Sequence, residues 1–224
     1  MTTAAHQQPL SPTERSTVRR GAKRAVADRA QLHAVLDAGY VCHLSTVVRG
    51  APLVLPTGYG RVDDTLYLHG STGALSLRTA ASGVEVCLAV TVLDGLVYAR
   101  SVFHHSMNYR SAVVHGTAVP VTDEAEKLAG LRAITEHLTP GSWDHARQPS
   151  RKELAATAVL AVDLAEAAVK VRAGGPVDDE DDVAADRAWA GHVPLALVAG
   201  EPVPAADLSP GWVVPSHVTR VADR

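Results

Sequence analysis

Short β-rich segments joined by two-residue turns constrain the fold of this chain most strongly. The segment at 40–48 (YVCHLSTVV) is rich in β-branched residues, Arg49-Gly50 turn the chain, and 51–60 (APLVLPTGYG) returns beside it. A turn this short joins antiparallel strands, because parallel strands need a crossover of a dozen or more residues. The pattern therefore predicts an antiparallel hairpin near the start of the chain.

The same pattern continues toward the C-terminus. We predict further strands at 65–70, 84–102, 108–121, 157–164 and 167–174, with 84–102 divided into two strands by a turn at Asp94-Gly95. Helices are predicted from Asp28, Ser71 and Asp123, which are residues that cap helices and that precede apolar positions at helical spacing. Six or more short antiparallel strands with helices inserted between hairpins predict a mainly β fold, a closed β-barrel.

Composition divides the chain into three parts. Residues 1–27 are polar and basic and predict an N-terminal arm, and residues 28–175 contain the barrel signals. Residues 176–224 hold the acidic run DDEDD at 178–182 and then a Pro-rich stretch. We expect this last part to be a solvated acidic loop followed by an extended segment that packs on the barrel.

Bulk properties exclude several classes of function. A formal net charge of −3 argues against electrostatic binding of nucleic acid. Two cysteines provide neither a disulfide framework nor zinc-finger spacing, which favours a reducing cytoplasm. No apolar run approaches the 18 or so residues of a membrane span. We expect a soluble cytoplasmic protein with no membrane partner.

The pair His104-His105 raises the question of a metal site. On a regular strand adjacent side chains point to opposite faces, so the two rings could not bind one ion, and Cys42-His43 fails by the same geometry. No phosphate-binding loop, nucleophile elbow, zinc-protease helix or dinucleotide fingerprint is present either. We therefore predict no protein metal site.

Polar residues instead gather at the ends of predicted strands, where barrels place ligand sites. Three clusters, at 55–60, 68–71 and 99–111, carry donors and acceptors that suit a polar ring system and a phosphate. The alternative is that these residues are ordinary turn and edge polar groups. The candidates are Thr57, Tyr59, His69, Ser71, Ser101, Asn108 and Arg110.

Five stretches carry a resemblance to a known family. They read VCHLSTVVRGAPLVLPTGYG, DDTLYLHGS, LDGLVYARSVFHHSMNYRSAVVHGTA, EKLAGLRAITEHLTPGSWD and KVRAGGPVDDEDD. Together they resemble the pyridoxamine 5′-phosphate oxidase-related flavin-nucleotide-binding proteins, which include the nitroimidazole-resistance-type reductases, over roughly residues 15–215. The resemblance implies an FMN-binding split barrel of the six-stranded antiparallel Greek-key type, assembled as a homodimer with the cofactor at the interface.

The resemblance also implies roles for individual residues. The strand from Pro56 to Tyr59 would flank the isoalloxazine ring, the segment from His69 to Ser71 would lie at the ribityl-phosphate end, and Arg78 would be a phosphate cation. Ser101 with the strand Asn108-Tyr109-Arg110 would close the site, partly from the neighbouring subunit, and His69 would be the proton donor. The full set of expected cofactor-binding residues is Pro56, Thr57, Gly58, Tyr59, His69, Gly70, Ser71, Arg78, Ser101, His104, His105, Asn108, Tyr109 and Arg110.

One departure from the family pattern concerns the phosphate. Where relatives continue with a Ser and then an Arg or Lys, this chain has Ala74 and Leu75. An Arg–phosphate pair is a strong contact that leucine cannot replace, although Arg78 lies one helical turn further on. Similar split barrels hold haem or a deazaflavin instead. Haem is therefore the alternative cofactor, with an axial ligand among His69, His104 and His105.

Three functions follow from these alternatives. The first is a flavin-dependent oxidoreductase that passes electrons from a nicotinamide nucleotide to a small acceptor, with the cofactor carrying the redox chemistry. The second is a haem enzyme on the same barrel. The third is a non-catalytic module that binds a flavin or another ligand without turnover.

Overall fold

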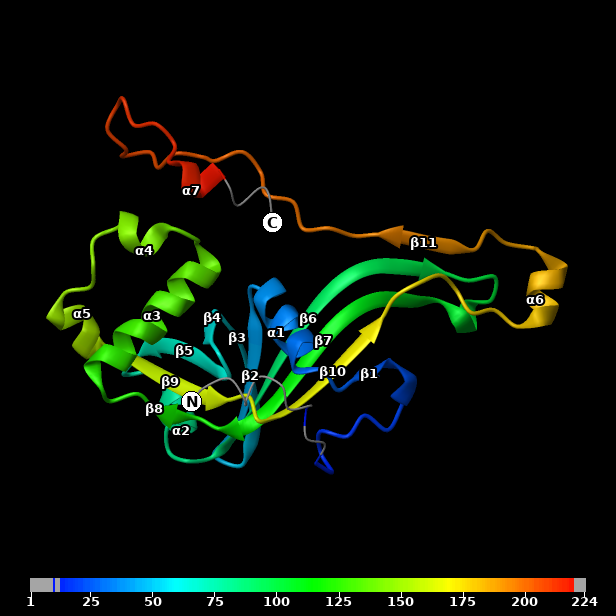
Figure 1. Ribbon diagram of the computed structural model, residues 1–224, viewed down its shortest axis with the longest axis horizontal. Coiled ribbons are helices and arrows are strands. Elements are labelled where there is room, and N and C mark those ends of the chain that lie inside the picture. The colour runs from blue at the N-terminus through cyan, green and yellow to red at the C-terminus, as the bar shows by residue number, and fades with distance from the viewer. Residues whose placement is uncertain (1–9, 11–12, 220–224) are drawn as a thin grey trace.

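Two antiparallel sheets form the fold in the computed structural model, which describes residue 10 and residues 13–219 (Figure 1). The larger sheet has the strand order β1-β10-β7-β6-β2-β3, and β11 pairs with β6 outside this path. Its strands are β1 (Ala25–Val26), β2 (Cys42–Val48), β3 (Ala51–Thr57), β6 (Glu85–Tyr98), β7 (Ser106–Thr117), β10 (Glu166–Arg172) and β11 (Gly191–Pro194). All pairings are antiparallel, as the short turns predicted.

The smaller sheet has the order β4-β5-β9-β8. Its strands are β4 (Tyr59–Val62), β5 (Thr65–Ser71), β8 (Val119–Pro120) and β9 (Thr157–Asp163). Gly58 alone separates β3 from β4, so the chain passes directly from the first sheet to the second at this point. The mainly β split-barrel architecture predicted from the sequence is thereby confirmed.

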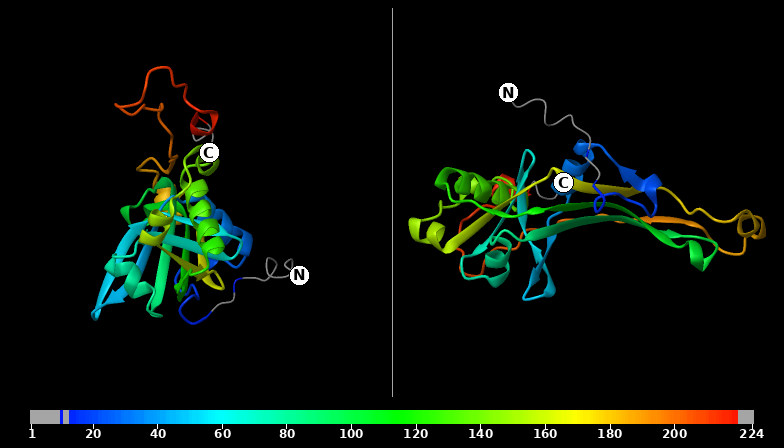
Figure 2. Two further views of the ribbon diagram at one scale, coloured as in Figure 1. Left: turned by 90° about the vertical axis from the view of Figure 1, so that its left-hand side faces the viewer. Right: turned by 90° about the horizontal axis from the view of Figure 1, so that it is seen from below.

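Most of the helices lie around the barrel, and one lies at the far end of the long strands β6 and β7 (Figures 1 and 2). They are α1 (Arg29–Ala38), α2 (Leu75–Ala80), α3 (Glu124–Leu138), α4 (Ser142–His145), α5 (Arg151–Ala156), α6 (Glu180–Ala185) and α7 (Ser216–Thr219), with 3-10 turns at Ala22–Arg24 and Val102–His104. Asp28 and Asp123 cap α1 and α3 as predicted, because their side chains accept hydrogen bonds from the first turn. Ser71 ends β5 instead, and α2 begins without a side-chain cap. Of the helices described, none is long and apolar enough to cross a membrane.

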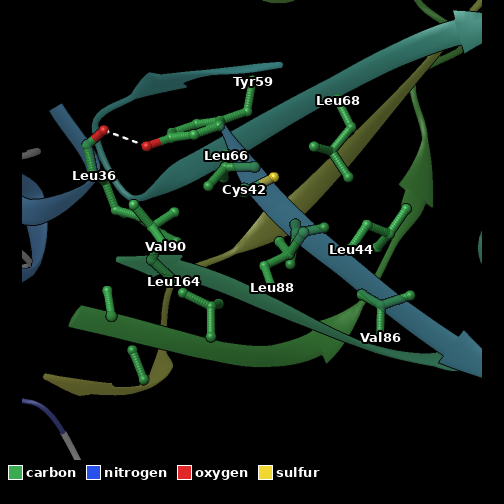
Figure 3. Packing of buried hydrophobic residues seen from close by; sticks show 14 of the residues in the cluster. Leu36, Cys42, Leu44, Tyr59, Leu66, Leu68, Val86, Leu88, Val90 and Leu164 are labelled. Carbon is green, nitrogen blue, oxygen red and sulfur yellow. Dashed lines mark hydrogen bonds between the residues drawn. The ribbon is translucent and has the colours of Figure 1, made fainter. Parts of the chain in front are cut away.

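Aliphatic side chains from α1 and from both sheets fill the barrel (Figure 3). Leu32, Val35 and Leu36 of α1 are almost completely buried and pack against strand residues such as Leu66 and Leu88. Cys42 is also buried here, and this burial raises the pKa of its thiol to about 12. Because this thiol stays protonated at neutral pH, Cys42 is a packing residue and not a nucleophile.

The β6–β7 hairpin extends well beyond the barrel (Figures 1 and 2). The predicted turn at Asp94-Gly95 is wrong, because β6 runs without a break from Glu85 to Tyr98 and only shifts its register between Leu93 and Gly95. A Cβ atom on Gly95 would lie 2.8 Å from the carbonyl oxygen of Val193 on β11. The glycine therefore permits a close approach between strands at a bulge, where the sequence suggested a reversal.

The acidic run lies beside the end of this hairpin. Asp178 is not solvated as expected, since its side chain is only 2% exposed and accepts hydrogen bonds from the backbone N–H and the guanidinium of Arg100. Burial alone would raise the pKa of Asp178, but these hydrogen bonds outweigh it and hold the pKa below its usual value. The first carboxylate of the run is thus part of the structure of the hairpin end.

The chain after β11 forms an extended strap, which we define as residues 195–215. From β11 it runs back from the hairpin end past the barrel to α7 (Figure 1). There the ring of His217 lies 4.6 Å from that of His145 on α4, measured between centroids. The strap is therefore held at both ends, by strand pairing at one and by helix contacts at the other.

Candidate functional site

A cleft of about 1080 Å³ lies where the strap passes the larger sheet. The end of α1 and the start of β2 form one side, the middle of β6 with Arg110 of β7 forms another, and strap residues 195–199 form the third. Its lining residues are Asp37, Ala38, Gly39, Tyr40, Val41, His43, Thr91, Val92, Leu93, Asp94, Arg110, Leu195, Ala196, Leu197, Val198 and Ala199. Most of them are apolar, which is typical of cofactor sites.

The apolar walls of the cleft are left exposed by the chain itself. Leu197 and Val198 of the strap are each 80% exposed, and Val41 and Leu93 of the sheet are 46% and 41% exposed. Isolated exposed apolar residues are ordinary on a protein surface, but a group that faces one concave space marks a binding surface. The cleft therefore suits a large, mostly apolar ligand.

Few polar groups face this apolar surface. Arg110 donates to both carboxylate oxygens of Asp94, at 2.9 and 2.8 Å, and these bonds raise the pKa of the guanidinium. His43 lies on the exposed face of β2 and makes no hydrogen bond with the residues that the structure describes. At the edge of the cleft, the carboxylate of Asp37 forms an ion pair with the guanidinium of Arg61, with 2.6 Å between nitrogen and oxygen. The imidazole of His43 is thus an uncommitted polar side chain of the cleft.

The residues predicted for the phosphate end of a flavin lie elsewhere, at the end of β5 and on α2. His69 and Ser71 are exposed on β5, and Arg78 is exposed on α2 with no ion pair among the described residues. Gly70 has a packing role, because a Cβ atom there would lie 2.3 Å from Leu77 of α2. Desolvation lowers the pKa of His69 below 6.5, so its neutral form predominates at neutral pH.

Pro56, Thr57 and Gly58 occupy the end of β3 and the passage to the second sheet. The side chain of Pro56 is exposed and that of Thr57 is half-buried. Gly58, like Gly70, allows close packing, since a Cβ atom at this position would lie 2.8 Å from the side chain of Leu138 on α3. The first two residues remain accessible to a ligand, and the third is fixed by its neighbours.

Tyr59 is among the residues predicted to contact the cofactor, and its side chain is enclosed by the barrel. The side chain is completely buried, and its hydroxyl lies 2.5 Å from the carbonyl oxygen of Leu36 and 2.8 Å from that of Gly39 (Figure 3). Burial raises the pKa of this phenol. The side chain of Tyr59 therefore ties the end of α1 to the barrel.

The side chain of Asn108 also has its partners within the chain. It is only 6% exposed, donates to the carbonyl oxygen of Gly174 at 3.1 Å and accepts from the guanidinium of Arg172. Both the oxygen and the nitrogen of the amide are therefore hydrogen-bonded, one to the last residue of β10 and the other to the turn that follows it. Its neighbour Tyr109 is half-buried on β7, and Arg110 is the member of this predicted trio that faces the cleft.

His104 and His105 lie at the end of the β6–β7 hairpin and not on a strand. Ser101 caps a 3-10 turn over Val102–His104, so the argument from alternating strand faces does not apply to the pair. The rings nevertheless have separate partners. Nε2 of His104 lies 3.2 Å from Asp179, and Nδ1 of His105 accepts the backbone N–H of Ala99 at 3.0 Å.

Sequence reasoning missed His43 as a site residue. It considered Cys42-His43 only as a candidate metal pair and rejected the pair. Cys42 indeed faces the core, so the two side chains do not point the same way. The signal that could have found it was the alternation of β2, where the residue between buried Cys42 and Leu44 must face outward. What covers that outer face depends on the strap, some 150 residues later.

Comparison with known proteins identifies the family. Residues 28–171 match the model of the pyridoxamine 5′-phosphate oxidase family. This chain belongs to that family. A comparison with curated protein sequences gives no match.

Two solved structures of the family resemble the chain over nearly its whole length. The flavocytochrome Anf3 from Azotobacter vinelandii is 36% identical, with 95% of this chain and 98% of that chain covered and a TM-score of 0.89. The FAD- and haem-binding protein from Mycobacterium smegmatis is 38% identical, with 89% and 97% covered and a TM-score of 0.85. Matches of this extent must include part of the segment beyond residue 171, where the family model ends.

A third solved structure resembles a smaller part of the chain. A protein of the 5-nitroimidazole antibiotic resistance type from Bacteroides thetaiotaomicron is 24% identical, with 66% of this chain and 86% of that chain covered and a TM-score of 0.57. At this identity the likeness supports the fold alone.

Proposed function

We propose that this family member is a redox protein that binds both a flavin and haem. The observation that carries the proposal is the near full-length similarity to two proteins, one a flavocytochrome and the other an FAD- and haem-binding protein. Haem, which the sequence suggested as an alternative to flavin, becomes a second cofactor beside it. The chain offers separate regions for the two groups, the β3 and β5 ends for the flavin and the apolar cleft for haem.

We propose FAD as the flavin, in place of the FMN that the sequence resemblance implies. FMN ends in a phosphate that carries up to two charges and needs a strong cationic clamp. In this chain Ala74 and exposed Leu75 stand where the clamp is expected, and Arg78 is the nearby cation. The pyrophosphate of FAD carries a single charge on each phosphate, and its adenosine adds contacts, so FAD depends less on that clamp.

The chain's own residues have the following roles in this proposal. Pro56 and Thr57 flank the flavin ring, Ser71 and Arg78 hold the phosphate end, and His69 delivers a proton at the flavin. When bound, the flavin accepts a hydride and haem accepts single electrons. The reductant is a nicotinamide nucleotide and the final acceptor is a small molecule. The protein contributes binding, orientation and a partly desolvated imidazole.

We also propose that the protein acts as a homodimer. The free end of the β6–β7 hairpin exposes large apolar side chains that one chain leaves uncovered, among them Val102 at 85% and Phe103 at 88% exposure. A second copy of the chain is the occupant that the family resemblance implies for such a surface. Residues of the hairpin, Ser101 and Tyr109 among them, then approach the flavin of the neighbouring subunit.

An anaerobic reduction experiment tests the function. Protein loaded with FAD and haemin is mixed with NADH or NADPH under nitrogen, and the flavin and haem absorption bands are followed together. We expect the flavin band to bleach first and the haem bands to shift to the ferrous form afterwards. If both cofactors bind but neither responds to either nucleotide, the protein is a non-catalytic binding module and the proposed activity is wrong.

A further inference from the structure

We propose that haem binds in the cleft between the strap and the larger sheet, with His43 as an axial ligand of the iron. The inference rests on the proposed function, since it assumes that haem is a cofactor of this chain. It goes beyond that function by assigning the site, the ligand and a role for the strap. The ligand set suggested by the sequence, His69, His104 or His105, is thereby replaced.

The size and chemistry of the cleft fit a tetrapyrrole. Cofactor pockets have volumes of about 300–1,000 Å³ and mostly apolar walls, and this cleft, at about 1080 Å³, is slightly larger than that range. Haem is a flat apolar macrocycle with two carboxylates at one edge. Val41, Leu93 and the strap residues Leu197 and Val198 supply exposed apolar surface on two sides of the space. Arg110 supplies a cation for a carboxylate edge, although Asp94 neutralises part of its charge.

The availability of the ring nitrogens favours His43 over the histidines predicted from the sequence. Iron binds the lone pair of a neutral imidazole nitrogen. In His105, Nδ1 accepts the N–H of Ala99, so the neutral ring carries its proton on Nε2 and has no free lone pair there. In His104, Nε2 faces the carboxylate of Asp179. Neither residue lines the cleft, whereas His43 lines it and has no hydrogen-bond partner among the described residues.

His69 is set apart by its position. It lies on β5 of the smaller sheet, beside the predicted phosphate loop, and it does not line the cleft. His137 is engaged as well, with Nε2 2.7 Å from the carbonyl oxygen of Gly39. Among the residues that line the cleft, His43 is the one that carries an imidazole.

The strap gives an independent reason for this location. The family model ends at residue 171, so the strap is an addition to the common barrel. It is anchored on β6 by β11 and by a hydrogen bond from the N–H of Leu195 to the carbonyl oxygen of Asp94, at 3.0 Å. Its apolar residues Leu197 and Val198 are nevertheless 80% exposed. A segment that is fixed at both ends but has uncovered apolar side chains over a cleft fits a cover for an apolar ligand.

Substitution of His43 tests the ligand assignment. His43 is exposed on β2, so His43→Gly should fold normally, and His192→Gly on β11 is a matched control that is also exposed and does not line the cleft. After reconstitution with haemin, we expect the haem content of His43→Gly to fall by about tenfold or more, as metal affinity does when coordination is impaired. Its FAD content should be unchanged. Added imidazole should restore a wild-type Soret band in His43→Gly, which a merely structural role would not allow.

Substitution on the strap tests the cover. Leu197→Asp places a charge at the cleft, and Val203→Asp is its control, because Val203 is 90% exposed on the same strap and does not line the cleft. We expect Leu197→Asp to lose haem and Val203→Asp to retain it. Wild-type haem content and an unchanged Soret band in His43→Gly would overturn the assignment while leaving the proposed function intact. Failure of the wild-type protein to bind haemin at all would instead refute the haem half of the proposed function.

Discussion

His43 of β2 and Pro56 of β3 lie directly opposite each other in the larger sheet, and both side chains are exposed. Opposite residues of an antiparallel pair project from the same face, with Cβ atoms about 4.5–5.5 Å apart. One outer face of the barrel therefore carries the proposed haem ligand and the residue assigned to the flavin ring. In the proposed function, this adjacency would bring the two redox cofactors close together.

Tyr59 should be a stability residue and not a cofactor residue. Tyr59→Phe removes a buried hydroxyl that lies within hydrogen-bond distance of two carbonyl oxygens at the end of α1. We expect the free energy of unfolding to fall by about 1–3 kcal/mol, because these carbonyl groups lose a partner. Urea unfolding measures this change. The FAD content of the folded variant should equal that of the wild type. A selective loss of flavin would contradict a purely structural role for the Tyr59 side chain.

The core position of Tyr59 illustrates what sequence could and could not predict here. Strands, caps and antiparallel pairing follow from local patterns, so β2, β3 and the Asp28 and Asp123 caps were predictable. The direction of Tyr59 is set by the passage of the chain from one sheet to the other at Gly58, which local alternation does not encode. From the sequence, a tyrosine whose hydroxyl is bonded inside the core cannot be told from one whose hydroxyl contacts a ligand.

The wrong turn at Asp94-Gly95 and the omission of His43 from the predicted site have a related cause. An Asp-Gly pair between apolar segments is a strong hairpin signal, yet here β6 continues through it and pairs with β7 on one side and with β11, about a hundred residues later, on the other. The cleft around His43 likewise needs strap residues 195–199. Contacts between distant segments decided both outcomes, and a single sequence contains no direct record of them.

Glu166 should make stability depend on acid pH. Hydrogen bonds from Arg15 and Thr13 lower the pKa of Glu166 from 4.5 to about 2, and the ion pair with Arg15 is 2.6 Å long. A depressed carboxyl pKa stabilises the fold fully above the unfolded value, and this contribution disappears as the pH falls from about 4.5 to about 2. Glu166→Gln should therefore show a shallower loss of Tm over that window. Because the pair is partly exposed, high salt should reduce the difference, and identical profiles at low salt would contradict this interpretation.

His69 should set the pH profile of flavin reduction or reoxidation. Desolvation lowers its pKa below 6.5, so the protonated donor is lost as the pH rises through that lower value. We expect turnover with a nicotinamide nucleotide to decline across this range, and His69→Gln to remove the inflection with its FAD content unchanged. His115→Gln, at a half-buried strand position, serves as the control. An inflection that persists in His69→Gln would assign proton delivery to another group.

The hairpin end should govern assembly. Phe103 is 88% exposed in the single chain, so Phe103→Asp should not disturb the barrel. If the second copy covers this surface, light scattering should show the mass of Phe103→Asp falling from that of a dimer toward that of a 23.5 kDa monomer. Val203→Asp should leave the mass unchanged. A wild-type protein that is monomeric at all concentrations would contradict the proposed homodimer.

The cofactor content of one reconstituted sample tests whether this chain binds a flavin and haem together. The protein is incubated with FAD and haemin, freed of unbound cofactor by gel filtration, and assayed for released flavin and for haem as its pyridine complex. We expect FAD and haem together on the same protein, each in proportion to the chain. A sample that retains flavin and lacks a Soret band, or retains haem and no flavin, would contradict it.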